Sequence, residues 1–432
     1  MKKLSNVCLA GIIFIIILYF LVGFLYIFNV PQWQSPDEPA HYNYIKYVAL
    51  TGTLPILQLG DYNQSDINNL MKIGSSLNFD IDSLKYEAHQ PPLYYVLLAP
   101  VFVIFEGSII VLRSVSLLLG ACVIILSVLV TRIVVLDNTP VILAVAGFVA
   151  FLPQHVAMMA SINNDSLAEV VILLGVLSTL RDDKPWIIGI IIGLGFLTKM
   201  TTYFLIVIGL FGVLYGSSKA NNKFMLVLQV IFPSILLGSV FWLRNIYTYG
   251  WPDLFGLIIH SDVVIGQPLT IDWINSLGLV EYLVRFLNTT FHSFWGQFGW
   301  MTIPMNTSIY FILKLVFVLV IIGCFSLGKY SSVKLKMYSR NVVLMLGMIL
   351  LVVSQYIWYN LSFVQHQGRY LFPSLSAIAL FYVFGISGWT GLLFSRILNY
   401  KKIGYWAPVA LVPILIVLDI YVLYYVIIPG YA

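Results

Sequence analysis

Two adjacent carboxylates, Asp37 and Glu38, lie between Pro36 and Pro39, shortly after the first apolar run of the chain. Proline restricts the backbone on both sides, so the two side chains are held in place. A carboxylate beside an apolar wall gains proton affinity, which suits a general base. The alternative is a helix N-cap in which Asp37 accepts hydrogen bonds from free backbone amides, and the two interpretations are compatible. A short amphipathic helix is expected to follow over 42–50.

Two further polar segments carry groups that could bind a substrate. The first has His89 just before Pro91-Pro92, and the double proline predicts a rigid start to a short helix. The second, 161–166, places Asp165 at the expected junction of two helices. A lone histidine near a membrane interface is more often structural than catalytic, and a turn with an N-cap is the simpler explanation of the second segment.

Three basic residues, Lys199, Arg244 and Arg369, lie near ends of apolar runs, on the same predicted side as most acids. Positive charges there bind lipid phosphates or paired acids, or else extend to the interface as anchors. Three such residues beside the acids favour a site. The aromatic and glycine-rich segment 293–300, which includes Trp295, is either a substrate wall or part of an interfacial aromatic belt.

The elements that must position these residues are membrane helices. Of 432 residues, 23 are Lys or Arg and 18 are Asp or Glu, so 9% are charged and 60% are hydrophobic. An ordinary soluble domain has about 25% charged residues, and this composition excludes a secreted, cytosolic or nucleic-acid-binding protein. No P-loop, dinucleotide-binding, HExxH or GxSxG motif occurs, which argues against a nucleotide-driven motor.

The chain is predicted to be a single all-α integral membrane domain over 1–432, with no soluble domain. Apolar runs of suitable length predict about eleven transmembrane helices. They are expected at 6–28, 109–131, 140–160, 165–180, 186–198, 201–217, 225–243, 307–327, 341–360, 370–394 and 404–428.

The distribution of charge predicts which side each connection faces. Most of the basic residues fall in short connections that share one side with the N-terminus, which is therefore expected to be cytoplasmic in a multi-pass plasma-membrane protein. Two large loops, 29–107 with interfacial helices and 244–306, are then external. The apolar run 93–105 is too short to cross comfortably and is expected to be re-entrant or interfacial.

Seven segments, in this order, resemble motifs of the GT-C superfamily of polytopic membrane glycosyltransferases. That superfamily includes protein O-mannosyltransferases, the lipid A aminoarabinose transferase and oligosaccharyltransferase catalytic subunits. The chain is most similar to an uncharacterised bacterial and archaeal membrane family placed within it. The resemblance is carried by Pro36–His41, His89–Tyr95, Asn163–Asp165, Gly195–Lys199, Trp242–Asn245, Phe294–Trp300 and Gln367–Pro373.

The resemblance implies an inverting transfer of a hexosyl or pentosyl unit from a polyprenyl-phosphate donor to an acceptor hydroxyl, on the outer face of the membrane. Asp37 would be the general base, and Glu38 would position the acceptor or share the proton. Because adjacent carboxylates disfavour double ionisation, one of them could titrate near neutral pH. The residues expected to bind substrate are His41, His89, Tyr94, Asp165, Lys199, Arg244, Trp295, Arg369 and Tyr370, with the three basic ones on the donor phosphate.

No cofactor is firmly expected, and a divalent metal is not favoured. Only one acid, Asp165, stands where some members have a metal-binding pair, although His41 and His89 leave a divalent metal open. The partners expected are the donor, membrane lipids, and a glycan, lipid or protein acceptor, with no nucleic acid. The identities of the sugar and acceptor are left open.

Two other functions remain as alternatives. A lipid-linked glycan flippase or transporter would place charged residues near the middle of its spans, often beside broken paired helices. The only clearly intramembrane acid here is Asp419, and no internal repeat is visible. A glycan polymerase or ligase would use external arginines and histidines instead of an acidic pair. An enzyme of the first kind should gather Asp37, His89, Asp165 and Arg369 around one cavity, and separations beyond about 20 Å would contradict it.

Overall fold

The apolar runs of the sequence form long helices in the computed structural model, which describes residues 4–73, 81–216, 222–330, 339–398 and 400–431. Within these ranges, seven stretches are long and apolar enough to cross a membrane. They are Asn6–Asn29 (α1), Ile109–Val135 (α5), Lys223–Tyr249 (α11), Thr307–Phe325 (in α15, Thr307–Tyr330), Arg340–Asn360 (α16), Gly368–Phe394 and Lys401–Gly430.

The last two stretches are continuous runs of shorter elements. Gly368–Phe394 comprises η3 (Gly368–Ser374), α17 (Leu375–Thr390) and the start of η4 (Gly391–Ile397). Lys401–Gly430 comprises α18 (Lys401–Trp406), η5 (Ala407–Ala410), α19 (Leu411–Val422), η6 (Leu423–Ile427) and α20 (Ile428–Gly430).

The other predicted spans are bent or short. The span expected at 140–160 consists of α6 (Thr139–Ala150) and α7 (Pro153–Met159), which meet at 61°. Pro153 begins α7 because it has no amide hydrogen to continue α6. The remaining three are α8 (Asp165–Leu180), α9 (Pro185–Phe196), and α10 (Leu205–Gly216) preceded by η2 (Met200–Thr202). The predicted fold class, an all-helical polytopic membrane protein, is confirmed.

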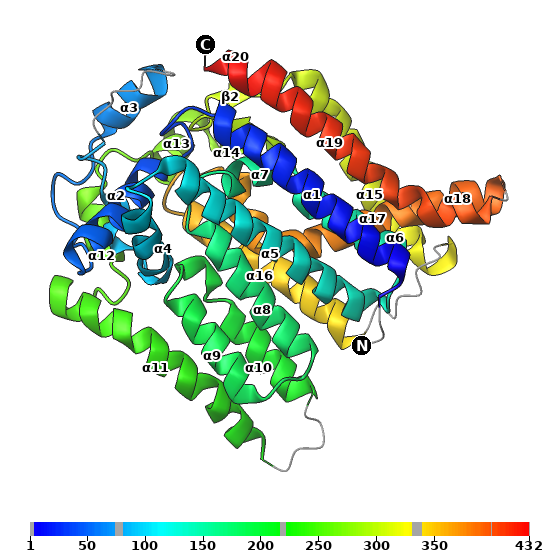
Figure 1. Cartoon of the computed structure of the whole chain (residues 1–432), viewed down its shortest axis with the longest axis horizontal. Coiled ribbons are helices and arrows are strands. Elements are labelled where there is room, and N and C mark those ends of the chain that lie inside the picture. The colour runs from blue at the N-terminus through cyan, green and yellow to red at the C-terminus, as the bar shows by residue number, and fades with distance from the viewer. Residues whose placement is uncertain (1–3, 74–80, 217–221, 331–338, 399, 432) are drawn as a thin grey trace.

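The bundle is held together by close helix pairs. Figure 1 shows α1 beside α19 along one edge and α9, α10 and α11 along the opposite one. The α15–α17 crossing is especially close, since a Cβ added to Gly385 would lie 2.2 Å from the carbonyl oxygen of Val320. Small residues allow such contact between membrane helices, whose association gains little from the hydrophobic effect.

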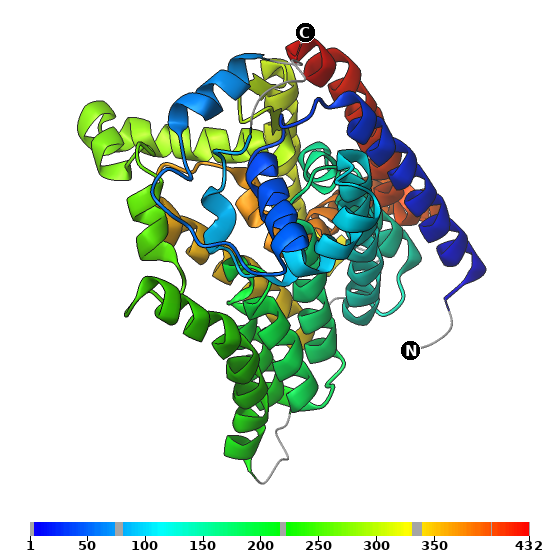
Figure 2. The same ribbon diagram turned by 60° about the vertical axis from the view of Figure 1, so that its left-hand side comes forward.

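The first large loop folds into short helices at the end of the bundle reached by the C-terminus of α1, here called the loop end (Figures 1 and 2). The elements of this loop are α2 (Glu38–Thr51), α3 (Gln64–Ile73), η1 (Tyr86–His89) and α4 (Leu93–Ile104). α4, which corresponds to the apolar run 93–105, has 12 residues and so extends about 18 Å, too short for a hydrocarbon core of about 30 Å.

The second large loop contributes to the same end. Its strands pair antiparallel, Gln297 with Pro304 and Phe298 with Ile303, and α14 lies across the bundle (Figure 2). Its elements are α12 (Leu257–Val263), α13 (Thr270–Leu277), α14 (Leu279–Trp295), β1 (Gln297–Phe298) and β2 (Ile303–Pro304). Part of the evidence for sidedness lies outside the described residues, namely Lys2, Lys3, Lys219, Lys334 and Lys336.

Candidate functional site

A cavity of about 550 Å³ opens at the loop end. Its wall combines the start of α2, η1, the η2 segment, α12, the end of α16 and the start of η3, so it joins both large loops to the bundle. Six of the residues expected to act in the site line it: Asp37, His41, His89, Lys199, Arg369 and Tyr370. Segments far apart in the sequence therefore converge on one cavity.

Asp37 occupies the N-cap position of α2, yet its side chain makes no capping hydrogen bond. Its backbone is left-handed, with φ 65°, a conformation that costs energy and is often found at functional sites. The carboxylate instead accepts a hydrogen bond from the Tyr86 hydroxyl at 2.9 Å and one from the Arg369 guanidinium at 2.5 Å. The N-cap position thus turns the carboxylate toward the cavity.

The charge state of Asp37 is set by opposing effects. Burial by itself would raise the pKa of this carboxyl, but the charge of Arg369, together with the hydrogen bonds from Arg369 and Tyr86, holds the pKa below its ordinary value of 3.8. Asp37 is therefore a carboxylate at neutral pH, able to accept a proton or orient a hydroxyl. Its side chain is 22% exposed and that of Arg369 9%, so the ion pair faces the cavity under limited solvent screening.

Glu38 points away from the cavity and is fully buried. Its two oxygens accept hydrogen bonds from the Arg113 guanidinium at 2.8 and 2.7 Å, and others from the backbone amides of Trp33 and Ile162. Arg113 also donates to the carbonyl oxygens of Ile27, Val30 and Pro31. This buried ion pair ties α1, α2 and α5 together beneath Asp37.

A second ion pair lies at the cavity wall, where Lys199 Nζ is 2.6 Å from Asp165 Oδ1. Lys199 lines the cavity, and Asp165 lies behind it, outside the lining. The Asp165 amide donates to Asn163 Oδ1 at 2.8 Å, so a local turn does form there, as the simpler explanation of this segment predicted. Lys199 therefore presents a positive charge that Asp165 holds in place.

The cavity histidines are uncharged at neutral pH. Burial, with the Lys199 charge, lowers the pKa of His41 to about 3, and His41 Nδ1 lies 2.9 Å from the Tyr95 hydroxyl. Burial also holds the pKa of His89 well below its ordinary value. His89 Nδ1–H donates to the carbonyl oxygen of Tyr86 at 2.9 Å, and its ring lies 4.2 Å from that of His260. Neutral imidazoles can exchange hydrogen bonds with a substrate without adding charge.

Besides Glu38 and Asp165, three residues that the sequence pointed to lie outside the cavity lining. Tyr94 is a buried residue of α4, and its hydroxyl lies 2.9 Å from Ser116 Oγ of α5. Arg244 is held by the Pro55 carbonyl oxygen and the Tyr249 hydroxyl, outside the cavity lining. Trp295 is 2% exposed and packs against Phe148 and Tyr382 in the core.

Several cavity residues were not singled out from the sequence. Glu87 is the most important of them: its Oε2 is buried without a hydrogen-bond partner among the described residues. Burial, with the Asp37 charge, raises its pKa to about 8. Glu87 lies two residues before His89, in the same motif, and this nearness in sequence was a signal that marks it as a site candidate. Further examples are Tyr86, Gln90, His260, Trp300, Tyr356, Tyr359 and Gln367, of which the last four flank no acid in the sequence.

An aromatic wall completes one side of the cavity. Tyr370 packs against Tyr356 and Tyr359, with ring centroids 6.0 and 5.9 Å apart, and lies 5.5 Å from the Arg369 guanidinium carbon. On another side, the Trp300 indole donates to the carbonyl oxygen of Trp33 at 3.0 Å. Such rings provide flat apolar surfaces beside the charged groups, which suits a ligand with both an apolar and an anionic part.

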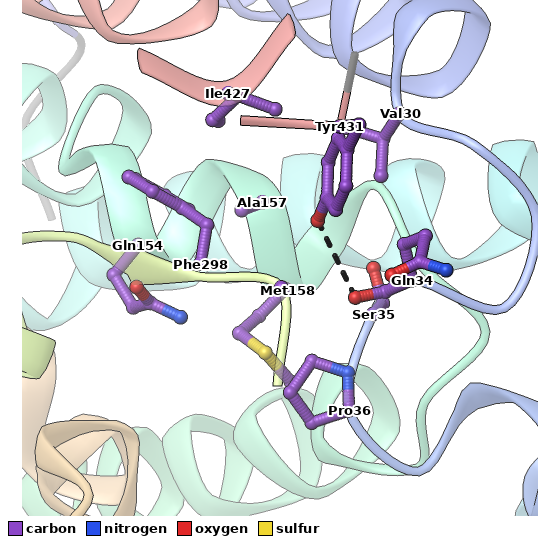
Figure 3. Close-up of a pocket in the computed structure, with 11 residues that line it drawn as sticks. Val30, Gln34, Ser35, Pro36, Gln154, Ala157, Met158, Phe298, Ile427 and Tyr431 are labelled. Atoms are coloured by element: carbon purple, nitrogen blue, oxygen red, sulfur yellow. Dashed lines mark hydrogen bonds between the residues drawn. The ribbon is translucent and has the colours of Figure 1, made fainter. Parts of the chain in front are cut away.

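A small separate hollow of about 20 Å³ lies behind Pro36, a residue it shares with the main cavity (Figure 3). Tyr431 reaches into it and donates to the carbonyl oxygen of Gln34 at 3.4 Å. The hollow has room for about one water molecule. Its walls hold the segment that leads into Asp37 against α7 and the C-terminal helix.

Among the described residues, no group of three or more His, Cys, Asp or Glu side chains is arranged to hold a metal ion. His89 and His260 form a pair, and Glu87 is turned to the same cavity, but no ligand set is complete.

Two comparisons place this geometry among known proteins. Residues 89–243 match the family model described as dolichyl-phosphate-mannose-protein mannosyltransferase. The structure resembles ArnT from Cupriavidus metallidurans, solved with undecaprenyl phosphate, with a TM-score of 0.50 and 14% identity over 97% of this chain and 73% of that one. The chain has a GT-C-like fold. The resemblance to this superfamily predicted from the sequence is confirmed.

A second GT-C structure agrees. The oligosaccharyltransferase of Archaeoglobus fulgidus, in complex with Zn and sulfate, matches with a TM-score of 0.50 and 13% identity over 96% of this chain. This chain spans 53% of that protein's length. No curated protein sequence matches. The matched family segment contains His89, Asp165 and Lys199, whereas Asp37 and Arg369 lie outside it.

Proposed function

We propose that this GT-C protein is an inverting glycosyltransferase that moves a sugar from a polyprenyl-phosphate donor to an acceptor hydroxyl at the outer face of the membrane. The observation that carries the proposal is the Asp37–Arg369 ion pair, with Lys199 on the same cavity. The pair joins a carboxylate that can take a proton to a cation that can bind phosphate. The undecaprenyl phosphate bound by ArnT supports the choice of donor.

In the proposed reaction, Asp37 accepts the proton of the acceptor hydroxyl while that oxygen forms a bond to the anomeric carbon. The bond between this carbon and the phosphate oxygen breaks, and its electron pair leaves with the phosphate. Arg369 and Lys199 then stabilise the added negative charge. The Tyr86 hydroxyl donates to Asp37 Oδ1 and the Arg369 guanidinium donates to Asp37 Oδ2, which fixes the direction of the carboxylate.

The roles of the remaining expected residues follow from their places. We assign Glu38 a positioning role, because Arg113 and two backbone amides already bind its oxygens. His41, His89 and Tyr370 are proposed to contact the substrate, while Asp165 positions Lys199. Tyr94, Arg244 and Trp295 support the surrounding structure.

The proposed function is tested with Asp37→Asn, which keeps the size of the side chain and removes its charge. Purified protein in lipid nanodiscs is given a panel of polyprenyl-phosphate sugars and an extract of cell-envelope acceptors, and products are followed by mass spectrometry. We expect wild-type protein to transfer one kind of sugar from the panel. The transfer rate of Asp37→Asn should be lower by a factor of about 10² or more, as for other essential bases.

The same assay contains the result that would overturn the assignment. If Asp37→Asn transfers sugar at the wild-type rate, Asp37 is not the base. If the wild-type protein releases no sugar from any donor but moves intact lipid-linked glycan across a vesicle membrane, the protein is a flippase.

A further inference from the structure

We propose that Glu87, Gln90 and Gln367 form a sugar-recognition subsite, in which the Glu87 carboxyl and the two amides bind hydroxyl groups of the transferred glycosyl unit. The inference rests on the proposed function and adds to it a division of the cavity. One part of the cavity binds the phosphate, and the other part recognises the sugar.

The first argument is a set of buried oxygens without partners. Glu87 Oε2, Gln90 Oε1 and Gln367 Oε1 are all buried, lack hydrogen bonds among the described residues, and belong to side chains that line the main cavity. Native proteins satisfy about 90% or more of their buried polar groups. Three unsatisfied oxygens on one cavity therefore indicate a ligand that supplies donors.

The second argument is the chemistry of those oxygens. Amide carbonyls only accept hydrogen bonds, and the nitrogen of Gln367 is already used, donating to Gln365 Oε1 at 2.8 Å. An oxygen-lined wall repels a phosphate but suits hydroxyl groups, each of which can donate. In a polyprenyl-phosphate sugar, the sugar is the part that carries several hydroxyl groups. The phosphate has its own cations in Lys199 and Arg369.

The third argument is the place of the subsite. Gln367 lies two residues before Arg369, and Glu87 follows Tyr86, so both are within two positions of a residue that hydrogen-bonds to Asp37. Gln90 lies on the η1 side with Glu87, and Gln367 comes from the segment that leads into η3. A sugar held there has its anomeric carbon near Asp37 and its phosphate near the cations.

Glu87 also has the charge state this role needs. Burial and Asp37 raise its pKa to about 8, while Lys199, Arg369 and a hydrogen bond from Gln90 act in the opposite direction. The other ionisable side chains that interact with it are the phenols of Tyr86, Tyr95, Tyr359 and Tyr370. At pH 7 its carboxyl is mostly protonated, so it can donate as well as accept and does not repel the phosphate.

The test compares binding of bare undecaprenyl phosphate with binding of undecaprenyl-phosphate hexoses and pentoses. The sugar that most improves wild-type affinity over the bare carrier is used throughout. We expect Glu87→Ala and Gln367→Ala each to weaken binding of the sugar-bearing carrier about fivefold to tenfold, the value of about one hydrogen bond. Binding of bare undecaprenyl phosphate should change less than twofold.

Two sets of variants serve as controls. Lys199→Met and Arg369→Gln should weaken both ligands alike, because they act on the phosphate. Glu281→Gln should change neither, since Glu281 pairs with Arg285 on the exposed part of α14. Wild-type affinity for the sugar-bearing carrier should also fall between pH 7 and 9, as Glu87 ionises, and Glu87→Gln should remove that fall.

The remaining outcomes would contradict either the sugar-recognition subsite or the proposed function. Equal losses for both ligands in Glu87→Ala, or no sugar that improves on the bare carrier, would overturn the subsite. An unchanged alkaline fall in Glu87→Gln would do the same. If wild-type protein binds neither bare nor sugar-bearing carrier, the proposed function itself fails.

Discussion

The Asp37–Arg369 ion pair gives the cavity a carboxylate whose charge depends on its neighbour. Arg369 offsets the burial that would otherwise raise the pKa of Asp37. In wild-type protein, the base form of Asp37 is therefore present throughout the neutral and mildly acidic range. It is lost only as the pH falls below the ordinary value of 3.8.

Arg369→Gln should move that acidic loss of activity toward neutral pH. Without the guanidinium, burial dominates and the pKa of Asp37 rises, so protonation of the base begins at a higher pH. The measurement is kcat/KM against pH for the residual activity of the variant. Lys199→Gln is the control, because Lys199 is not among the groups that shift Asp37. Identical acidic limbs in Arg369→Gln and wild-type protein would refute this view of Asp37.

Glu38→Gln should behave as a stability variant. It leaves Arg113, which is 2% exposed, as a buried charge without an ionised partner, and breaking a buried pair costs about 3–5 kcal/mol. We expect a clear fall in the thermal unfolding temperature in detergent, whereas Asp37→Asn unfolds close to wild type. An inactive Glu38→Gln protein of normal stability would instead show that Glu38 takes part in the reaction.

The sequence identified most of the charged residues of the site but not their partners. Asp37, Lys199 and Arg369 were found because each stands out as a charge near the end of an apolar run. The partner of Glu38 was missed because Arg113 lies within an apolar helix, 75 positions along the chain, with no local pattern to connect the two. Arg244 was assigned to the site because the same local signal also marks cations that bind backbone carbonyls.

At the scale of elements, η3 carries Arg369 and depends on a close contact with α14. A Cβ on Gly368 would lie 2.3 Å from the backbone nitrogen of Phe294, and the Gly368 amide donates to Ser293 Oγ at 2.7 Å. Only glycine permits this approach, so the position of Arg369 is set by a residue that has no side chain.

Gly368→Ala should therefore reduce activity without changing any charged group. The added methyl pushes η3 away from α14 and displaces Arg369, and a misplacement of about 1 Å can lower kcat/KM on the order of a hundredfold. Gly347→Ala is the matched control, because a Cβ there meets nothing within 4 Å. Steady-state kinetics of the two variants give the comparison, and equal activities would mean that the contact does not position Arg369.

The short helices of the loops were the hardest elements to predict. The helix expected at 42–50 is present but begins at Glu38, because Pro39 fits the first turn of a helix. The short α12 had no clear signal in the apolar pattern. The bend between α6 and α7 was missed because the apolar run continues through it, although Pro153 marks the break. The aromatic segment 293–300 was found, but its division between core Trp295 and cavity Trp300 depends on tertiary packing.

At the scale of the whole molecule, both large loops and the cavity share one end of the bundle, so a single orientation in the membrane decides where the reaction occurs. The charge distribution predicts that this end faces outside. The orientation can be measured with cysteines introduced at Leu59, in the first loop, and at Arg181, after α8. Cys8, Cys122 and Cys324 are first replaced by alanine.

In intact cells, a membrane-impermeant maleimide should label Leu59→Cys and leave Arg181→Cys unlabelled until the cells are opened. Both positions are exposed, so access depends on the side of the membrane. The reverse pattern would place the cavity on the cytoplasmic side, and would require a donor presented there.

The two tryptophans in the cavity wall make occupancy optically visible. Of the ten tryptophans in the chain, Trp300 and Trp358 line the cavity. Their emission should change when a ligand displaces water from beside them, whereas that of core residues such as Trp295 stays constant. Replacing Trp300 with phenylalanine isolates its share of the signal. The protein thus contains its own fluorescent reporter, which allows unlabelled donors and acceptors to be screened by titration.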